Sequence, residues 1–100
     1  MKFKNFEEFY PYYLGEHANI TCRKLHFFGT SGVLALLLII FFTGNFALLW
    51  GLPIIGYGFA WAGHMLFEKN RPATFKHPLY SLMGDFRMFW DILVGRVKAF

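Results

Sequence analysis

The stretch that decides the fold is "LHFFGTSGVLALLLIIFFTGNFALLWGLPIIGYGFAWAGHMLF", residues 25–67. Its 43 residues include no Asp, Glu, Lys or Arg. A helix that crosses a bilayer needs about 20 apolar residues, so this run is long enough for two crossings and a tight turn. We therefore predict two antiparallel membrane-spanning helices, from about Cys22 to Phe42 and from about Phe46 to Asn70.

Two segments compete for the turn between these spans. "TGN" (Thr43–Asn45) suits a turn because Gly and Asn tolerate turn geometry. "GLP" (Gly51–Pro53) would shorten the second span to about 16 residues, below the usual crossing length. We therefore favour the first turn, which leaves Pro53 in the first turns of the second span, where it is tolerated. The second span also carries small residues that suit close helix contact, including a homodimer contact: Gly56, Gly58, Ala60, Ala62 and Gly63.

Shorter amphipathic segments flank the spans on both sides. "NFEE" at residues 5–8 has the pattern of a capping box and predicts a helix over about 5–14, kinked or kept short by Pro11. Its aromatic residues fit either the membrane interface or ordinary helix packing. Residues 78–100 predict an amphipathic helix that lies in the interface or dips into the bilayer. Its apolar face comprises Leu79, Leu82, Phe86, Phe89, Leu93 and Val97, opposite Arg87, Asp91, Gly95 and Lys98.

The composition agrees with a small membrane protein of one domain, residues 1–100, in the all-α class. Hydrophobic residues make up 56% of the chain and charged residues only 16%, against about a quarter in soluble domains. The net charge of +4 comes from basic residues that flank apolar segments, which favours membrane anchoring over nucleic-acid binding. We expect no cleaved signal peptide, and the single Cys22 cannot form an internal disulfide.

The hairpin topology brings all four histidines to one face of the membrane. His26 begins the first span and His64 is near the end of the second, while His17 and His77 lie just outside them. The basic residues Arg23, Lys24, Lys69, Arg71 and Lys76 collect at the same face. The positive-inside tendency makes that face cytoplasmic, in a bacterial cytoplasmic membrane or, for a eukaryotic protein, in the endoplasmic reticulum.

Four histidines on one face indicate a metal site, although a lone interfacial histidine often binds nothing. His64 and Glu68 are four residues apart and so share one side of a helix. A chain break capped by Asn19 or Thr21 would let His17 fold back towards His26. Imidazoles with a carboxylate suit Fe(II), Zn, Mn or Cu, and the spacing alone selects none of them. Cys22 and His26, also four apart, form a weaker candidate pair.

Two sequence blocks that bracket the hairpin resemble a known family. "YYLGEHANITCRKLHFFGT" (residues 12–30) is similar to an H-x-N-x6-H block, and "WAGHMLFEKNRPATFKHPLY" (residues 61–80) to a W-x-G-H-x3-E-x3-P-A block. Both blocks characterise a small membrane family that includes the yeast 2-hydroxy-fatty-acid dioxygenase of phytosphingosine breakdown. The matching positions are His17, Asn19, His26, His64, Glu68, Pro72 and Ala73. Cys22 stands where the family has asparagine, and the segment around His77 resembles the short bacterial members.

This resemblance implies an Fe(II)-dependent enzyme of fatty-acid α-oxidation, which uses O2 to shorten a 2-hydroxy long-chain fatty acid by one carbon. It implies iron ligation by His17, His26 and His64, with His77 as a further candidate. Glu68 is expected as a ligand or as a partner that orients an imidazole, and Asn19 as a second catalytic position. The basic residues expected to hold the substrate carboxylate are Arg23, Lys24, Lys69 and Arg71.

Two readings from other classes remain open on the sequence. His26 and His64 at one end of two antiparallel helices could instead supply the axial ligands of a haem. The chain could also be a small non-enzymatic membrane subunit whose histidines bind nothing. A di-iron desaturase-like enzyme is disfavoured because that class requires about twice as many histidines as this chain contains.

Overall fold

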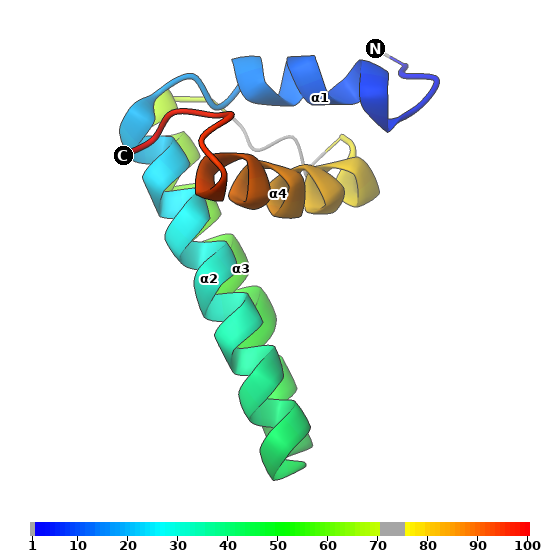
Figure 1. Ribbon diagram of the computed structural model, residues 1–100, viewed down its shortest axis with the longest axis vertical. Helices are drawn as coiled ribbons and strands as arrows, with labels where there is room; N and C mark the ends of the chain where they lie inside the picture. Colours follow the sequence, from blue (N-terminus) through cyan, green and yellow to red (C-terminus); the bar gives the residue numbers. More distant parts are fainter. Residues whose placement is uncertain (1, 71–75) are drawn as a thin grey trace.

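The computed structural model describes residues 2–70 and 76–100 and is built entirely from helices within them. The helices follow in this order: α1 (Phe6–Gly15), α2 (Ile20–Thr43), a 3₁₀ helix η1 (Phe46–Trp50), α3 (Gly51–Ala62), a π-helical segment η2 (Gly63–Glu68) and α4 (Pro78–Leu93). Helices α2 and α3 form a long antiparallel leg, and α1 and α4 lie across one end of it as a head (Figure 1). The all-α class and the two-helix hairpin are therefore confirmed.

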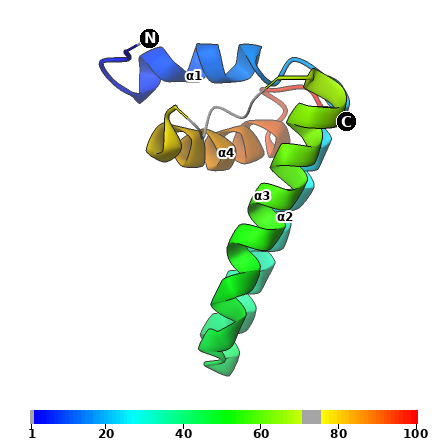
Figure 2. The ribbon, with the colours of Figure 1, turned by 180° about the vertical axis from the view of Figure 1, so that it is seen from behind.

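The leg is long and apolar enough to cross a membrane. Helix α2 has 24 residues and the continuous helix from Phe46 to Glu68 has 23, and their most apolar 18-residue windows have mean hydropathies of 2.2 and 1.4. At 1.5 Å per residue, α2 is about 36 Å long, against about 30 Å for a hydrocarbon core. Only 22% and 11% of the residues in the most apolar windows are buried within the chain, so most of the leg exposes apolar surface. Seen from behind, α2 and α3 stay side by side along the whole leg (Figure 2).

The turn of the hairpin lies where the "TGN" segment predicts it. Helix α2 ends at Gly44, which adopts a left-handed conformation (φ +66°) and donates its amide to Ile40 O. Glycine adopts this conformation without steric cost, which explains its place at the helix end. Pro53 lies near the start of α3, as expected. The close approach of α2 to α3 needs Gly29 and Gly32, where an added Cβ would come within 2.9 Å and 2.8 Å of side chains of α3.

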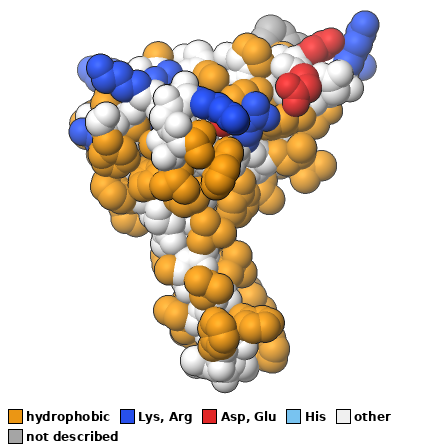
Figure 3. Space-filling model, in the orientation of Figure 1, with side chains coloured by type: hydrophobic (Ala, Val, Ile, Leu, Met, Phe, Trp, Pro, Cys, Tyr) orange, Lys and Arg blue, Asp and Glu red, His pale blue; other side chains and the backbone are white. Residues whose placement is uncertain are grey.

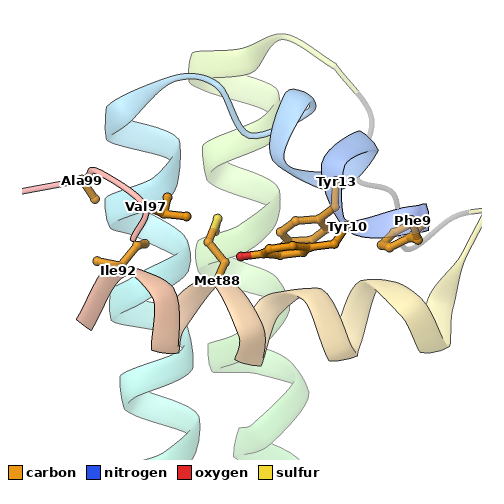
Figure 4. Close-up of a cluster of buried hydrophobic side chains, with 7 residues drawn as sticks. All are labelled: Phe9, Tyr10, Tyr13, Met88, Ile92, Val97 and Ala99. Carbon is orange, nitrogen blue, oxygen red and sulfur yellow. The ribbon is translucent and has the colours of Figure 1, made fainter. Parts of the chain in front are cut away.

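The head is held together by α1 packed on α4. Asn5 caps α1 by accepting the Glu8 amide at 2.9 Å, while the Glu8 carboxylate accepts the Lys4 amide, close to the predicted capping box. The buried face of α1 contributes Phe9, Tyr10 and Tyr13 to the core cluster of the head (Figure 4). The cluster is completed by Met88, Ile92, Val97 and Ala99. The predicted first helix therefore packs on the rest of the protein.

Helix α4 is shorter than predicted, and it exposes many apolar residues although it buries Met88 and Ile92 in the core of the head. It ends at Leu93, because the Asp91 carbonyl accepts the amides of Arg96 and Val97 and Gly95 adopts a positive φ of 84°. Its polar residue Asp91 is buried against α1, where its carboxylate accepts the Tyr10 hydroxyl at 2.8 Å. The exposed apolar residues of α4 and the turn after it are Leu79, Leu82, Met83, Phe86, Trp90, Leu93 and Val94.

The surface separates charge from apolar area along the long axis. Lys, Arg, Asp and Glu side chains gather on the head, while the leg shows only apolar and uncharged surface (Figure 3). The exposed apolar residues of α4 therefore continue the apolar surface of the leg. This continuity suits a helix that lies flat at the membrane boundary with its apolar side towards the hydrocarbon.

Candidate metal centre

Three histidines from three separate segments meet inside the head. His17 follows α1, His26 is in the second turn of α2, and His64 is in η2. Each is buried, with 1%, 4% and 1% of its surface exposed. The Nε2 atom of His17 lies 3.0 Å from that of His26 and 2.8 Å from that of His64. Among the described residues, these three form the cluster that could hold a metal ion.

Each imidazole is oriented by a hydrogen bond at its other nitrogen. Nδ1 of His17 lies 2.6 Å from Tyr13 O, and Nδ1 of His26 lies 2.9 Å from Cys22 O. A carbonyl oxygen only accepts, so both Nδ1 atoms carry the proton and both Nε2 atoms present a lone pair to the cluster. Such partners fix the tautomer and the ring orientation of metal-binding histidines.

Asn70 orients the third imidazole. Its Oδ1 lies 2.7 Å from Nδ1 of His64, and its Nδ2 donates to the carbonyl and the carboxylate of Glu16, each at 3.2 Å. Because Nδ2 is committed to acceptors, the oxygen is the atom that faces His64, and His64 donates its Nδ1 proton. The sequence analysis used Asn70 only as a helix end. The signal that could have indicated its role is an amide oxygen within a few residues of a candidate ligand, because a metal-binding histidine usually donates its other N–H to an acceptor.

Three lone pairs therefore point at one another, an arrangement that a cation between them would stabilise. Burial, and then the neighbouring His26 and His64, lower the pKa of His17 well below its usual range. A neutral imidazole is the form that binds a metal. The two short Nε2 separations bring the three ligand nitrogens within reach of one ion. The donor set thus fits a small ion with open coordination positions.

The same geometry bears on the haem alternative. The ring centroids of His26 and His64 are 5.0 Å apart, and His17 lies 4.3 Å from both. A flat macrocycle held by two axial imidazoles must pass between them. The third ring stands against both of these rings, so the arrangement favours a single small ion over a porphyrin.

The π-helical segment sets the position of His64. A π-helix contains an extra residue per turn relative to an α-helix, and such segments are frequent at functional sites. The segment packs closely on α2 at Gly63, where an added Cβ would lie 2.9 Å from the Cys22 sulfur. Cys22 itself is fully buried, with its sulfur 3.6 Å from Nδ1 of His26, on the side of the ring away from the cluster.

Glu68 and Asn19 interact with each other at the edge of this centre. The Glu68 carboxylate accepts the backbone amide of Asn19. The Asn19 side chain caps α2 by accepting the amides of Thr21 and Cys22, at 2.9 Å and 3.2 Å. Glu68 is thus beside the start of α2, and Asn19 is the helix cap in place of Thr21.

The predicted substrate-binding cations have varied surroundings. Arg23 donates to His17 O at 2.6 Å and to Lys98 O at 3.1 Å. It therefore connects the C-terminal segment to the loop between α1 and α2. Lys24 lies over the Phe100 ring, 5.4 Å from its centroid, and Lys69 is exposed at the end of η2. Arg71, together with Pro72 and Ala73, lies outside the described residues.

The fourth histidine, His77, lies apart from the other three. Its ring packs against the aromatic rings of Phe3, Phe9 and Tyr12, with centroids 5.2–6.2 Å apart. It also occupies the cap position before Pro78 of α4. The structure therefore brings together three of the four predicted histidine ligands.

An apolar groove of about 350 Å³ leads from the histidines along the hairpin. Its walls come from α2, α3 and α4: His26, Thr30, Val33, Leu52, Pro53, Gly56, Tyr57, Ala60, Leu82, Asp85 and Phe86. From Ala60 to Leu52 the groove follows α3 for about 12 Å at 1.5 Å per residue. Its volume is in the range of small-molecule sites, which are apolar with few polar groups. The sequence did not indicate that α4 would form one wall of this groove.

The polar groups of the groove include a carboxyl group with a raised pKa. Burial raises the pKa of Asp85 to about 7, and a hydrogen bond from the Tyr13 hydroxyl opposes part of that rise. Burial and then Asp85 raise the pKa of Tyr13 well above its usual value. The Tyr13 ring stacks on His17 with centroids 4.0 Å apart, so this pair joins the groove to the cluster.

A comparison with protein families shows to which family this chain belongs. Residues 3–97 match the family described as "2-hydroxy-palmitic acid dioxygenase Mpo1-like". The chain belongs to the Mpo1-like family. The match covers nearly the whole chain and includes all three clustered histidines, which agrees with the resemblance noted in the sequence. No curated protein and no solved structure matches the chain.

Proposed function

We propose that this Mpo1-like protein is an Fe(II)-dependent dioxygenase that shortens 2-hydroxy long-chain fatty acids by one carbon. The observation that carries the proposal is the convergence of three neutral, buried imidazoles at one end of an apolar groove. The family description supplies the substrate class and the reaction type. Imidazole donors alone suit several transition metals, so the identity of the ion as iron also comes from the family.

The two ends of the substrate would bind in two different environments. The acyl tail would lie in the groove against Val33, Leu52 and Phe86, and its burial supplies binding free energy without fixed chemistry. The carboxylate end would lie at His26, where the apolar walls exclude water. Iron held by His17, His26 and His64 would supply oxygen activation for cleavage of the bond between C1 and C2.

The supporting residues would hold the ligands in place during turnover. Tyr13 O, Cys22 O and Asn70 keep each Nδ1 protonated and each Nε2 available. Glu68 would act through Asn19 on the start of α2 and would not bind the ion directly. Lys24, Lys69 and Arg71 would attract the anionic substrate to the head, and Arg23 would anchor the C-terminal segment.

We further propose that the hairpin is inserted in a membrane and that the head lies on the cytoplasmic side. The charged residues of the head and the uncharged leg support this placement. The groove opens between the leg and α4, next to apolar surface, so a fatty acid could enter from the bilayer without crossing water.

The decisive experiment combines metal analysis with turnover. Protein purified in detergent and reconstituted with Fe(II) should bind one iron per chain and convert 2-hydroxypalmitate to the acid with one carbon fewer, only in the presence of O2. His64→Ala should lose both iron and activity, whereas His77→Ala should keep its iron. A wild-type protein that binds iron but never shortens such acids would refute the activity, and an active, iron-loaded His64→Ala would refute the site.

A further inference from the structure

The groove contains a carboxyl group that metal binding does not use. Asp85, on α4, accepts the Tyr13 hydroxyl with Oδ1 and makes no other hydrogen bond with the described residues. It lines the groove together with His26, across from α2 and α3. Its second oxygen thus has no partner in the described part of the chain, although the surrounding walls are mostly apolar. That oxygen is accessible from the groove, and a hydroxyl group in the groove could donate a hydrogen bond to it.

The position of Asp85 relative to the histidines is fixed by Tyr13. The Tyr13 ring stacks on His17, and the Tyr13 hydroxyl donates a hydrogen bond to Asp85. The side chain of Tyr13 therefore connects the carboxyl group of Asp85 to the imidazole of His17. Gly84 makes this possible, because a Cβ there would lie 2.8 Å from two atoms of the Tyr13 ring. The carboxyl therefore faces the part of the groove nearest the metal cluster, where the first carbons of a bound acid would lie.

We propose that Asp85 binds the 2-hydroxyl group of the substrate and thereby selects one enantiomer of the 2-hydroxy acid. This inference rests on the proposed function, because it assumes that the carboxylate end lies at the histidines and the tail in the groove. These two attachments fix the direction of the chain. The hydroxyl on C2 then points to the α4 wall in one enantiomer and away from it in the other.

The chemistry of the wall favours this assignment over a general role in binding acids. A carboxylate accepts a hydrogen bond from a hydroxyl, and bonds to charged acceptors are about twice as strong as neutral ones. A fatty acid without the hydroxyl has no group to offer to Asp85 and would leave its oxygen unpaired. Sites built to bind a hydroxyl group reject analogues that lack it for this reason. Asp85 would thus be a specificity-determining residue.

The test measures binding without turnover. Iron-loaded protein in detergent is titrated under nitrogen at about pH 8, where Asp85 is mostly charged. The ligands are the two enantiomers of 2-hydroxypalmitate and palmitate, in competition with a fluorescent fatty acid. The wild type should bind one enantiomer at least about tenfold more tightly than the other, as expected for a hydrogen bond to a charged group. In Asp85→Ala this ratio should fall to about one, and in Asp85→Asn, which keeps an oxygen for the Tyr13 hydroxyl, to an intermediate value.

Controls separate this role from a structural one. If Asp85 only supported Tyr13, its loss would weaken both enantiomers and palmitate equally and leave the ratio unchanged. Glu7→Ala removes a carboxylate from the exposed side of α1 and should keep the wild-type ratio. Equal binding of the enantiomers by the wild type, or an unchanged ratio in Asp85→Ala, would overturn the inference. Failure of the proposed function would show differently, as iron-loaded protein without O2-dependent shortening.

Discussion

Asn70 offers the sharpest test of how the metal centre is built. Its Oδ1 accepts the Nδ1 proton of His64 at 2.7 Å, which fixes the ring with Nε2 towards His17. Asn70→Ala removes this acceptor and leaves the imidazole free to rotate or change tautomer. Loss of such a partner lowers metal affinity by about 10–100-fold, or about 1.4–2.7 kcal/mol.

Glu68 provides the matched comparison, because the sequence alone made it the partner of His64. In the structure its carboxylate accepts the Asn19 amide. Glu68→Gln keeps an oxygen for that amide and removes the charge, so it should change metal affinity by no more than about threefold, well below the effect of losing an imidazole partner. A metal-ligating carboxylate would behave differently, since its amide is a much poorer ligand.

The assay is anaerobic competition for Fe(II) between the protein and a chromophoric chelator, with far-ultraviolet circular dichroism to verify that each variant is folded. The wild type should bind Fe(II) most tightly, Glu68→Gln within about threefold of it, and Asn70→Ala at least about tenfold more weakly than the wild type. An Asn70→Ala variant with wild-type affinity would refute the role of Asn70. A Glu68→Gln variant weaker than Asn70→Ala would return Glu68 to the coordination sphere.

Three further predictions concern stability. Fe(II) at 100 times its dissociation constant should stabilise the metal-free protein by about 2.7 kcal/mol, measured on heating by labelling of Cys22, which is fully buried when folded. Gly63→Ala should cost about 1–3 kcal/mol and weaken metal binding because its Cβ would lie 2.9 Å from the Cys22 sulfur, whereas Gly58→Ala, with open space, should be neutral or stabilising in the same assay. Because burial raises the Asp85 pKa from 3.8 to about 7, the folded state holds that proton more tightly, and its stabilising contribution is complete below pH 4 and lost as the pH rises through 7. Wild-type stability should therefore fall relative to Asp85→Asn over this interval, by at most about 4 kcal/mol, and parallel curves would contradict the shift.

The sequence was sufficient for the parts of the fold that depend on local pattern. An uncharged run of 43 residues with "TGN" near its middle specifies a helical hairpin, because length and turn chemistry leave few alternatives. The hairpin in turn places His26 and His64 at one end. The cap at Asn19 was also predictable from residue type, and with it the loop that brings His17 back to the cluster.

The partner of His64 could not be predicted because it depends on backbone that departs from an α-helix. A spacing of four residues puts Glu68 beside His64 only if the α-helical period continues. The chain instead forms a π-helical segment and then places Lys69 in a left-handed conformation, with φ of 58°. This turn brings Asn70 back to His64 and directs Glu68 to the start of α2. No residue pattern in that segment announces the change of period.

The orientation of α4 connects the fold to the proposed chemistry. A helix in a soluble protein buries its apolar face, yet α4 exposes Leu79 and Leu93 while Asp91 is 3% exposed and Asp85 faces the groove. The exposure of these apolar residues is favourable if lipid surrounds the outer face, because they are then removed from water. The inner face is consequently free to carry polar groups, and it does so beside the metal cluster. In a membrane, one short helix of this chain could therefore serve both as an anchor and as the polar wall of a site. The same polar residues would be hard to accommodate in a soluble domain of this size, since its interior would need those positions for an apolar core.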